Sequence, residues 1–316
     1  MKHLISVIVL FLAGMQLAHA ASGRIFVTNE RSNDISVING ATLEVERTIE
    51  VGDRPRGIGI SPDGKELYVA VTEENAIAVI DLNSLELLRK FQAGSDPETF
   101  AVHPNGNIYI SNEDDAKASV YDPRTGEQLA EIQVGLEPEG VAISPDGKQV
   151  IITSESTNML HVIQVPEHTI AANILVGARP RAATFSGDSK IAYSTSEISG
   201  EVKKVDMTTY EVIAVRKIAD EKAKPKDVIL NQDETKLYVA GGRANQVIVM
   251  DADTMEVIKG IPVGKRVWGL AMTKDGGKVF STDGVSGTVS VIDTAKDEVI
   301  KTIEVGKFPW GVVIDD

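Results

Sequence analysis

Short apolar runs separated by polar turns divide this chain into strand-length segments, most clearly between Asp53 and Gly94. The first turn of this stretch is Ser61-Pro62-Asp63-Gly64, in which proline presets φ and glycine takes the position that needs conformational freedom. A single four-stranded meander cannot bury both of its faces, so it must stack on copies of itself. The pattern predicts strands at Arg56–Ile60, Glu66–Val71, Ala76–Asp81 and Leu87–Gln92.

Copies of this stretch follow one another along the chain. Val-Gly or Ala-Gly pairs close the repeats at intervals of 41–42 residues, except for one interval of 87. That long interval contains two repeats, and the boundary between them, near Ala219-Asp220, lacks the glycine. A period of about 40–45 residues with four strands per unit is typical of a β-propeller. The closing glycines are Gly52, Gly94, Gly135, Gly177, Gly264 and Gly306.

The two ends of the repeat array predict how many blades there are. Residues 53–306 hold six complete units, and residues 24–52 supply only the second, third and fourth strands of another. The last ten residues, KFPWGVVIDD, form a first strand with nothing after it. We therefore predict an all-β, seven-bladed β-propeller of four-stranded antiparallel blades. Its ring is closed by the C-terminal strand joining the N-terminal blade, which leaves no exposed edge.

Residues 1–20 have the features of a signal peptide. Lys2-His3 give a short basic start, Leu4–Leu12 an apolar run, and Ala18-His19-Ala20 a small-residue cleavage site. The alternative is an uncleaved membrane anchor, for which the apolar run is too short to span a bilayer. We expect export to the periplasm with cleavage after Ala20, no membrane span after signal removal, and residues 21–316 as one propeller domain.

Composition narrows the possible chemistry. The absence of cysteine excludes disulfides, thiolate metal sites and a cysteine nucleophile. The formal net charge is −14, and removal of Lys2, the one charged residue of the leader, makes it −15. This acidic balance argues against binding of the phosphate backbone of nucleic acids. We expect a monomer.

One position of the repeat carries the candidate chemistry. The residue just before each first strand should lie where the inter-blade loops converge on the mouth of the central channel. Both tryptophans of the chain fall at this position, in neighbouring blades, with cationic residues on either side and two neighbouring glutamates opposite. The seven residues of this ring are Arg56, Glu98, Glu139, Arg181, Lys226, Trp268 and Trp310.

The ring composition predicts a binding site for a flat or carboxylated small molecule, stacked on indole and held by cationic donors. Two alternatives stay open: the indoles plug the channel or pack between blades, or the ring is a protein-docking patch. Charges in nearby loops are segregated by blade, which would orient a partner on approach. Arg54, Arg179, Lys224, Arg266 and Lys307 are positive, and Glu113, Asp114, Asp115 and Glu155 are negative.

Signals for catalysis are poor. By repeat alignment, His103 and His168 lie in turns on the far face and His161 lies within a strand, so histidine-based catalysis at the mouth looks excluded. Glu98 and Glu139 could be an acid–base pair or, with Asn112 and Asp114, ligands of a hard metal. No metal-loop spacing supports this, and pairing of the two acids with Arg56 and Arg181 is the better account. We predict no catalytic residue and no metal site.

The repeats resemble the YVTN-type β-propeller family, since Leu67-Tyr68-Val69 and Leu237-Tyr238-Val239 are close copies of its hallmark strand. The loops further resemble a more restricted family, the β-propeller proteins associated with PQQ (pyrroloquinoline quinone)-dependent alcohol catabolism. The turn at 186–189 and the loop at 219–226 depart from that family's pattern. The loops that carry the likeness include Glu137-Pro138-Glu139-Gly140, Thr157-Asn158-Met159, Arg179-Pro180-Arg181, Arg266-Val267-Trp268, Gly284-Val285-Ser286 and Pro309-Trp310-Gly311.

This resemblance implies a periplasmic accessory protein and implies no known reaction. No cofactor is firmly predicted, but PQQ is a candidate ligand, and the partners implied are a periplasmic dehydrogenase or a transport component. One alternative is a scaffold that docks on a periplasmic dehydrogenase or cytochrome. The other is a lactonase-type hydrolase, which would use acidic and cationic residues of the funnel.

Overall fold

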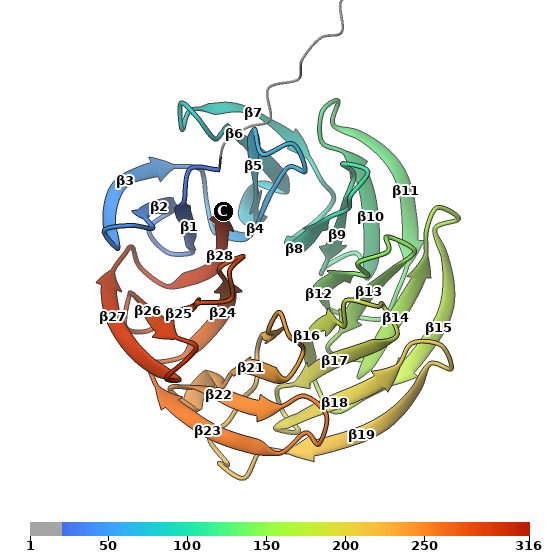
Figure 1. The fold of residues 1–316 in the computed structure, drawn as a ribbon. Coiled ribbons are helices and arrows are strands. Elements are labelled where there is room, and N and C mark those ends of the chain that lie inside the picture. Colours follow the sequence, from blue (N-terminus) through green and yellow to red (C-terminus); the bar gives the residue numbers. More distant parts are fainter. Residues whose placement is uncertain (1–20) are drawn as a thin grey trace, which may run out of the picture.

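The computed structural model describes residues 21–316, so the signal-peptide prediction for residues 1–20 lies outside the described residues. Seven four-stranded antiparallel sheets are arranged as blades around a central axis, with the first strand of each blade innermost (Figure 1). The predicted fold is confirmed, including the number of blades. No helix in the described part of the chain is long and apolar enough to cross a membrane.

Each blade runs from the axis to the rim in chain order, except that the first blade takes its innermost strand from the C-terminus. The strands of the first blade are β28 (Pro309–Asp315), β1 (Arg24–Asn29), β2 (Asp34–Asn39) and β3 (Glu44–Glu50). The next three blades are β4 (Pro55–Ile60), β5 (Glu66–Val71), β6 (Ala76–Asp81) and β7 (Leu87–Gln92); β8 (Pro97–Val102), β9 (Ile108–Asn112), β10 (Lys117–Asp122) and β11 (Glu127–Gln133); and β12 (Pro138–Ile143), β13 (Gln149–Ser154), β14 (Met159–Gln164) and β15 (Thr169–Leu175). The last three are β16 (Pro180–Phe185), β17 (Ile191–Ser196), β18 (Glu201–Asp206) and β19 (Glu211–Lys217); β20 (Val228–Leu230), β21 (Lys236–Ala240), β22 (Gln246–Asp251) and β23 (Val257–Pro262); and β24 (Val267–Met272), β25 (Lys278–Asp283), β26 (Thr288–Asp293) and β27 (Glu298–Glu304). Two short 3₁₀ helices, η1 (Thr72–Glu74) and η2 (Gly242–Ala244), lie in second-to-third strand loops.

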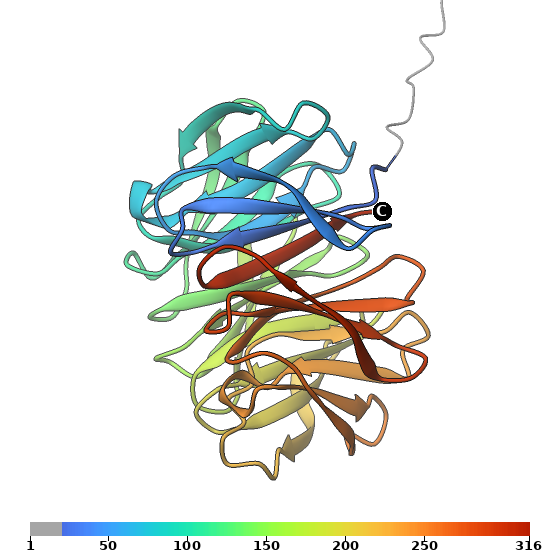
Figure 2. The same ribbon diagram turned by 90° about the vertical axis from the view of Figure 1, so that its left-hand side faces the viewer.

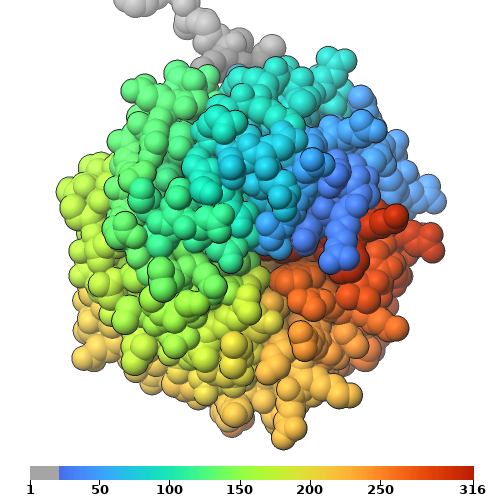
Figure 3. Space-filling model, turned by 180° about the vertical axis from the view of Figure 1, so that it is seen from behind, coloured from blue at the N-terminus to red at the C-terminus, as the bar shows by residue number. Residues whose placement is uncertain are grey.

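The ring closes where the two ends of the chain meet. Strand β28 pairs with β1 in antiparallel register, from Arg24 opposite Asp315 to Asn29 opposite Pro309. The backbone N–H and the hydroxyl of Ser22 also donate to Asp315 Oδ2, at 2.8 and 2.6 Å. The C-terminal residues consequently lie against the N-terminal blade in both the side view and the view from behind (Figures 2 and 3).

Local side-chain hydrogen bonds explain why the turns recur. In the first-to-second strand turn, Ser61 Oγ donates to Asp63 Oδ1 at 2.8 Å, and Gly64 takes a φ of +71°. At the end of the third strand, Asp81 Oδ1 accepts the N–H groups of Asn83 and Ser84, at 2.9 and 2.7 Å. Short polar side chains that bind their own backbone in this way favour turns over continued strand.

The core consists of seven apolar clusters in the described residues, one between each pair of neighbouring blades. The second strand of each blade is buried on both faces, because successive side chains point toward opposite neighbours. In β1, for example, Phe26 packs toward β5 and β6, whereas Ile25 and Val27 pack toward β25 and β26. Blades therefore stabilise one another as the repeat analysis requires.

Candidate functional site

A backbone irregularity in the first strand accompanies six of the seven ring residues, all except Lys226. In β4, Pro55 pairs with Val71, but the next regular pair is Ile58 with Val69, so Arg56 stands outside the ladder. The same shift occurs at Glu98, Glu139, Arg181 and Trp268. Bulges of this kind turn a side chain away from the regular alternation of a strand.

Hydroxyl groups on second strands hold the ring residues from the neighbouring blade. Thr282 Oγ1 donates to the carbonyl of Trp310 at 2.7 Å, and Thr195 Oγ1 donates to the carbonyl of Lys226 at 2.7 Å. Two blades have alanine at the equivalent position, Ala70 and Ala240. The other bonds of this set are Thr28 to Arg56, Ser111 to Glu139 and Thr153 to Arg181.

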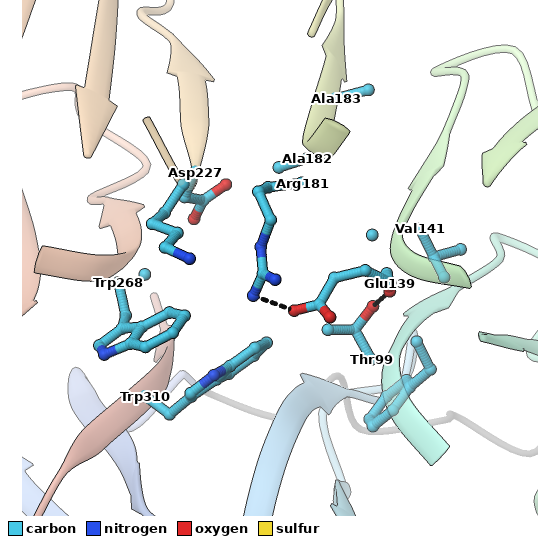
Figure 4. A pocket seen from close by; sticks show the side chains of 13 residues that line it. Thr99, Glu139, Val141, Arg181, Ala182, Ala183, Asp227, Trp268 and Trp310 are labelled. Atoms are coloured by element: carbon cyan, nitrogen blue, oxygen red, sulfur yellow. Dashed lines mark hydrogen bonds and ion pairs between the residues drawn. The ribbon is translucent and has the colours of Figure 1, made fainter. Parts of the chain in front are cut away.

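Two adjoining cavities form a funnel along the axis. The outer cavity, here called the mouth, has a volume of about 360 Å³, and the inner one, the throat, about 150 Å³. Glu139, Arg181, Lys226 and Trp268 line both. Figure 4 shows the two indoles side by side in the throat, with Arg181 reaching toward Glu139.

The charged side chains that line the mouth are mainly cationic, although the chain as a whole has a formal charge of −14. Eight cationic side chains line it against four acidic ones, so the local balance opposes that of the rest of the surface. Such a cavity attracts anions. The cations are Arg31, Arg54, Arg56, Arg179, Arg181, Lys226, Arg243 and Arg266, and the acids are Glu30, Glu113, Glu139 and Glu197.

The two indoles lie against each other inside the funnel. Their ring centroids are 6.3 Å apart with an interplanar angle of 27°. Three cations approach the Trp268 ring, with Lys226 Nζ at 4.3 Å, Arg266 Cζ at 4.8 Å and Arg181 Cζ at 5.5 Å from its centroid. Cations already lie over both indoles, so neither ring presents an open face on which a ligand could stack. The site instead presents a ligand with charged groups beside aromatic edges.

Arg181 is the centre of a buried ion network. Its guanidinium pairs with Glu155 and with Glu139, and lies 3.8 Å from Glu197 Oε2. Arg179, which is more exposed, contacts the same Glu155 and Glu197 at 2.6 and 3.4 Å. The predicted pairing of Arg181 with Glu139 is confirmed.

A second network surrounds Glu98. Arg56 pairs with Glu98, as predicted, and Arg54 Nη2 lies 3.3 Å from its other oxygen. Burial, followed by the negative charge of Glu139, raises the pKa of Glu98, although the Arg56 charge opposes this shift. For Arg56, burial acts to lower the pKa, but Glu98, Glu139 and Glu30 outweigh it, so the pKa is raised. Glu98 is fully buried and lines neither cavity, so its contacts are with Arg54 and Arg56 behind the wall of the mouth.

Asp96, Glu98 and Glu113 bring one oxygen each to within 4.8 Å of one another. Burial also raises the pKa of Asp96, against the charge of Arg54. Arg54 Nη1 is 3.3 Å from Asp96 Oδ1, so the arginines already compensate this acidic group. The arrangement is that of a structural ion network.

Two neighbouring residues of the throat titrate near neutral pH. Burial, followed by the positive charge of Arg181, lowers the pKa of Lys226 to about 7, although Glu197 at 2.5 Å opposes the shift. Burial raises the pKa of Asp227 to about 6, although its carboxylate accepts the N–H groups of Leu270 and Val228. The remaining accessible surface of Asp227 faces the channel, since this residue lines the throat.

Sequence reasoning missed Asp227, Arg31 and Arg243. Asp227 follows the ring residue, where the other blades have glycine, alanine or threonine, and this contrast was visible in the aligned repeats. Those small residues are needed because the position faces the next first strand: a Cβ on Gly311 would lie 2.5 Å from the Arg56 carbonyl. Arg31 and Arg243 lie in second-to-third strand loops, and the structure brings both side chains to the mouth.

The three histidines of the described chain are engaged away from the funnel. His103 Nε2 is 2.8 Å from the Gly147 carbonyl, and His168 Nε2 is 3.0 Å from the Tyr109 hydroxyl. His161 Nε2 accepts the Gly135 N–H at 2.9 Å, and burial lowers its pKa. The predicted absence of histidine from the mouth is confirmed for the described residues.

Two family models match the sequence. The choice-of-anchor I domain model matches residues 95–289, and the SMP-30/gluconolactonase/LRE-like region model matches residues 11–154. No curated protein matches the chain.

Several solved structures share the fold. A Kuenenia stuttgartiensis hydrazine synthase chain has a TM-score of 0.79 at 18% identity, covering 90% of this chain and 99% of that one. A candidate 6-phosphogluconolactonase from Bacteroides fragilis NCTC 9343 has a TM-score of 0.79 at 19% identity, covering 93% and 98%. The dihydro-heme d1 dehydrogenase NirN in complex with DHE has a TM-score of 0.71 at 14% identity, covering 94% and 76%. At these identities the likeness is one of fold.

Proposed function

The chain belongs to the choice-of-anchor I domain family, and on this β-propeller frame we propose a non-catalytic protein that binds a small carboxylated ligand in its funnel. One observation carries the proposal. In a chain of charge −14, eight cationic and four acidic side chains line a mouth that also contains Trp268, and Trp310 lies in the adjoining throat. Positive charge concentrated in a concave, partly desolvated site is what recognition of an anion requires.

The cations of the mouth differ in their freedom to bind a ligand. Arg56 and Arg181 are held by buried glutamates, whereas Arg266 has no acidic partner within 4.0 Å among the described residues. Burial, followed by the charge of Arg243, lowers the pKa of Arg266, which indicates two cations close together. A carboxylate between Arg243 and Arg266 would relieve this repulsion and accept charge-assisted hydrogen bonds.

Within this proposal, PQQ is the ligand that the sequence resemblance favours. PQQ is planar and carries three carboxylates, which suit the cations of the mouth. The throat, at about 150 Å³, has the volume of a cavity that accepts benzene, whereas ligand sites commonly span about 300–1,000 Å³. We therefore place PQQ in the mouth, at about 360 Å³, and smaller carboxylates in the throat. The cellular setting that we propose is periplasmic, as an accessory to PQQ-dependent alcohol oxidation.

Tryptophan fluorescence tests the binding proposal, because both indoles lie in the funnel. PQQ and monocyclic aromatic carboxylates should change the tryptophan emission saturably. The same titration of free N-acetyltryptophanamide gives the correction for absorbance of light by the ligand. Arg266→Gln should raise the dissociation constant about tenfold or more, because it removes a hydrogen bond between charged groups. Arg124→Gln is the matched control, since Arg124 is exposed and pairs with Asp122 in the turn between β10 and β11, on the opposite face. Absence of a saturable change with every carboxylate would refute the proposal.

A docking scaffold is the second candidate, and exposed apolar side chains favour it. Leu136, Ile198 and Val285 are 51–60% exposed and lie on loops of the mouth face. These residues could contact a periplasmic dehydrogenase, cytochrome or transport component. A complex purified from periplasmic extract that survives Trp268→Phe but is lost with Ile198→Asp would favour docking. Ile213→Asp on the outer strand β19 is the control, since Ile213 is also about half exposed, at 52%, but lies at the rim.

The lactonase-type alternative gains one observation from the structure. Asp227 and Lys226, with pKa values of about 6 and about 7, could exchange protons near neutral pH in the throat. The SMP-30/gluconolactonase-like match over residues 11–154 points in the same direction. Turnover of a lactone panel that is abolished by Asp227→Asn would favour this alternative over non-catalytic binding.

A further inference from the structure

Lys226 occupies an unusual place for a lysine. Its side chain is almost completely buried, yet it lines both the mouth and the throat. The backbone is held on both sides: its N–H donates to the Ala240 carbonyl at 2.9 Å, and its carbonyl accepts the Thr195 hydroxyl at 2.7 Å. These bonds fix the backbone at the cavity wall, and burial restricts the side chain, in contrast to the mobile side chain of a surface lysine.

The charges around this amine leave it poorly compensated. Glu197 Oε2, at 2.5 Å, is its one close anionic contact among the described residues, and Arg179 and Arg181 share that carboxylate at 3.4 and 3.8 Å. Arg181 and Arg266 also approach the same indole as Lys226. Burial, followed by the positive charge of Arg181, therefore favours loss of the amine's proton and lowers the pKa of Lys226 to about 7, while the arginines that share Glu197 leave this carboxylate less available to the amine.

From this arrangement we propose that Lys226 captures, as an imine, a small carboxylate that also bears an aldehyde or ketone. The inference rests on the proposed function and extends it from ionic to reversible covalent binding. The neutral amine attacks the carbonyl carbon, a C–N bond forms, and loss of one water molecule leaves a C=N bond. Hydrolysis reverses these steps, so the exchange needs no oxidant or reductant.

The remaining residues of the funnel suit the carboxylate end of such a ligand. Arg266 Cζ lies 4.8 Å and Lys226 Nζ 4.3 Å from the centroid of the Trp268 ring, so both cations lie close to the same indole. A ligand whose carboxylate and carbonyl are adjacent could contact Arg266 and Lys226 together. The throat volume of about 150 Å³ restricts the carbonyl end to a small group.

Reductive trapping tests the imine directly. The wild-type protein is incubated at pH 7 with glyoxylate or pyruvate and sodium cyanoborohydride, which reduces imines, and labelled lysines are located by peptide mass spectrometry. Lys224, in the same loop, is the matched internal control. The neutral fraction of an ordinary lysine at pH 7 is about a thousandfold below that of an amine half-deprotonated there. We expect labelling of Lys226 to exceed that of Lys224 by about tenfold or more.

Variants separate covalent capture from ionic binding. Lys226→Arg keeps the positive charge but has no amine that forms an imine, so it should abolish the label at this position and leave the labelling of Lys224 unchanged. If Lys226 is labelled no faster than Lys224 although carboxylates still change the emission, covalent capture is refuted and the binding function stands. If carboxylates cause neither labelling of Lys226 nor a change in emission, both proposals are refuted.

Discussion

Replacement of Arg181 by methionine would test whether the funnel is built around a buried ion network. Arg181 is 7% exposed, and its guanidinium pairs with Glu139 and Glu155, which are also buried. Methionine preserves much of the apolar stem but leaves the two carboxylates without their central counterion. Removing one partner of a buried ion pair costs about 3–5 kcal/mol, because the charge left behind stays desolvated.

This loss converts into a measurable change in thermal stability. For a domain of about 300 residues, the unfolding entropy implies about 1.6 °C per kcal/mol, so the melting temperature should fall by about 5–8 °C at pH 7. Differential scanning calorimetry of both proteins at pH 7 measures this loss.

Arg179→Met is the matched control. Arg179 contacts the same Glu155 and Glu197, but its side chain is 44% exposed, and exposed pairs contribute about 1 kcal/mol or less. Equal losses of melting temperature in the two variants would refute the reasoning. That result would mean that burial is not what makes the network costly to break.

Three further predictions concern other parts of the structure. Deletion of residues 309–316 removes β28 and leaves β1 as an open edge, so size-exclusion chromatography should show aggregation of the shortened chain. A soluble monomer with an unchanged circular dichroism spectrum would contradict ring closure. Thr282→Val removes the hydroxyl that donates to the Trp310 carbonyl, so it should lower the free energy of unfolding by about 1 kcal/mol and shift the tryptophan emission. Unchanged emission would show that this bond does not position the indole. Because the pKa of Lys226 is lowered to about 7, the unfolded chain binds a proton that the folded protein lacks between about pH 7 and pH 10. Wild type should therefore gain stability relative to Lys226→Met as the pH rises through this window, by up to about 1.4 kcal/mol per unit, and a constant difference in melting temperature would count against the shift.

The sequence predicted the frame of the site better than its electrostatics. The ring residues were identified because repeat alignment assigns one equivalent position to every blade, and six of the seven line the funnel. Glu98 does not, because Arg54 and Arg56 cover it. The ion pairs of Arg56 and Arg181 followed from opposite charges at neighbouring ring positions. Arg181 has two additional partners, Glu155 and Glu197, which lie on loops that follow second strands. Their distance from Arg181 depends on the conformation of each loop, which the repeat pattern does not specify.

Blade number, ring closure and the equivalence of the seven mouth positions were determined by the amino-acid sequence alone. The reason is that each repeat contains its own turns and strands, so a local pattern repeated along the chain specifies the whole ring. Only the tertiary structure decided which cations are neutralised and which remain available. Ion pairing and desolvation depend on separations of a few ångströms between side chains of different blades, and these separations are absent from any one repeat. Lys226 shows the difference: its position followed from the repeat, but its lowered pKa arises from burial and from Arg181 in the next blade.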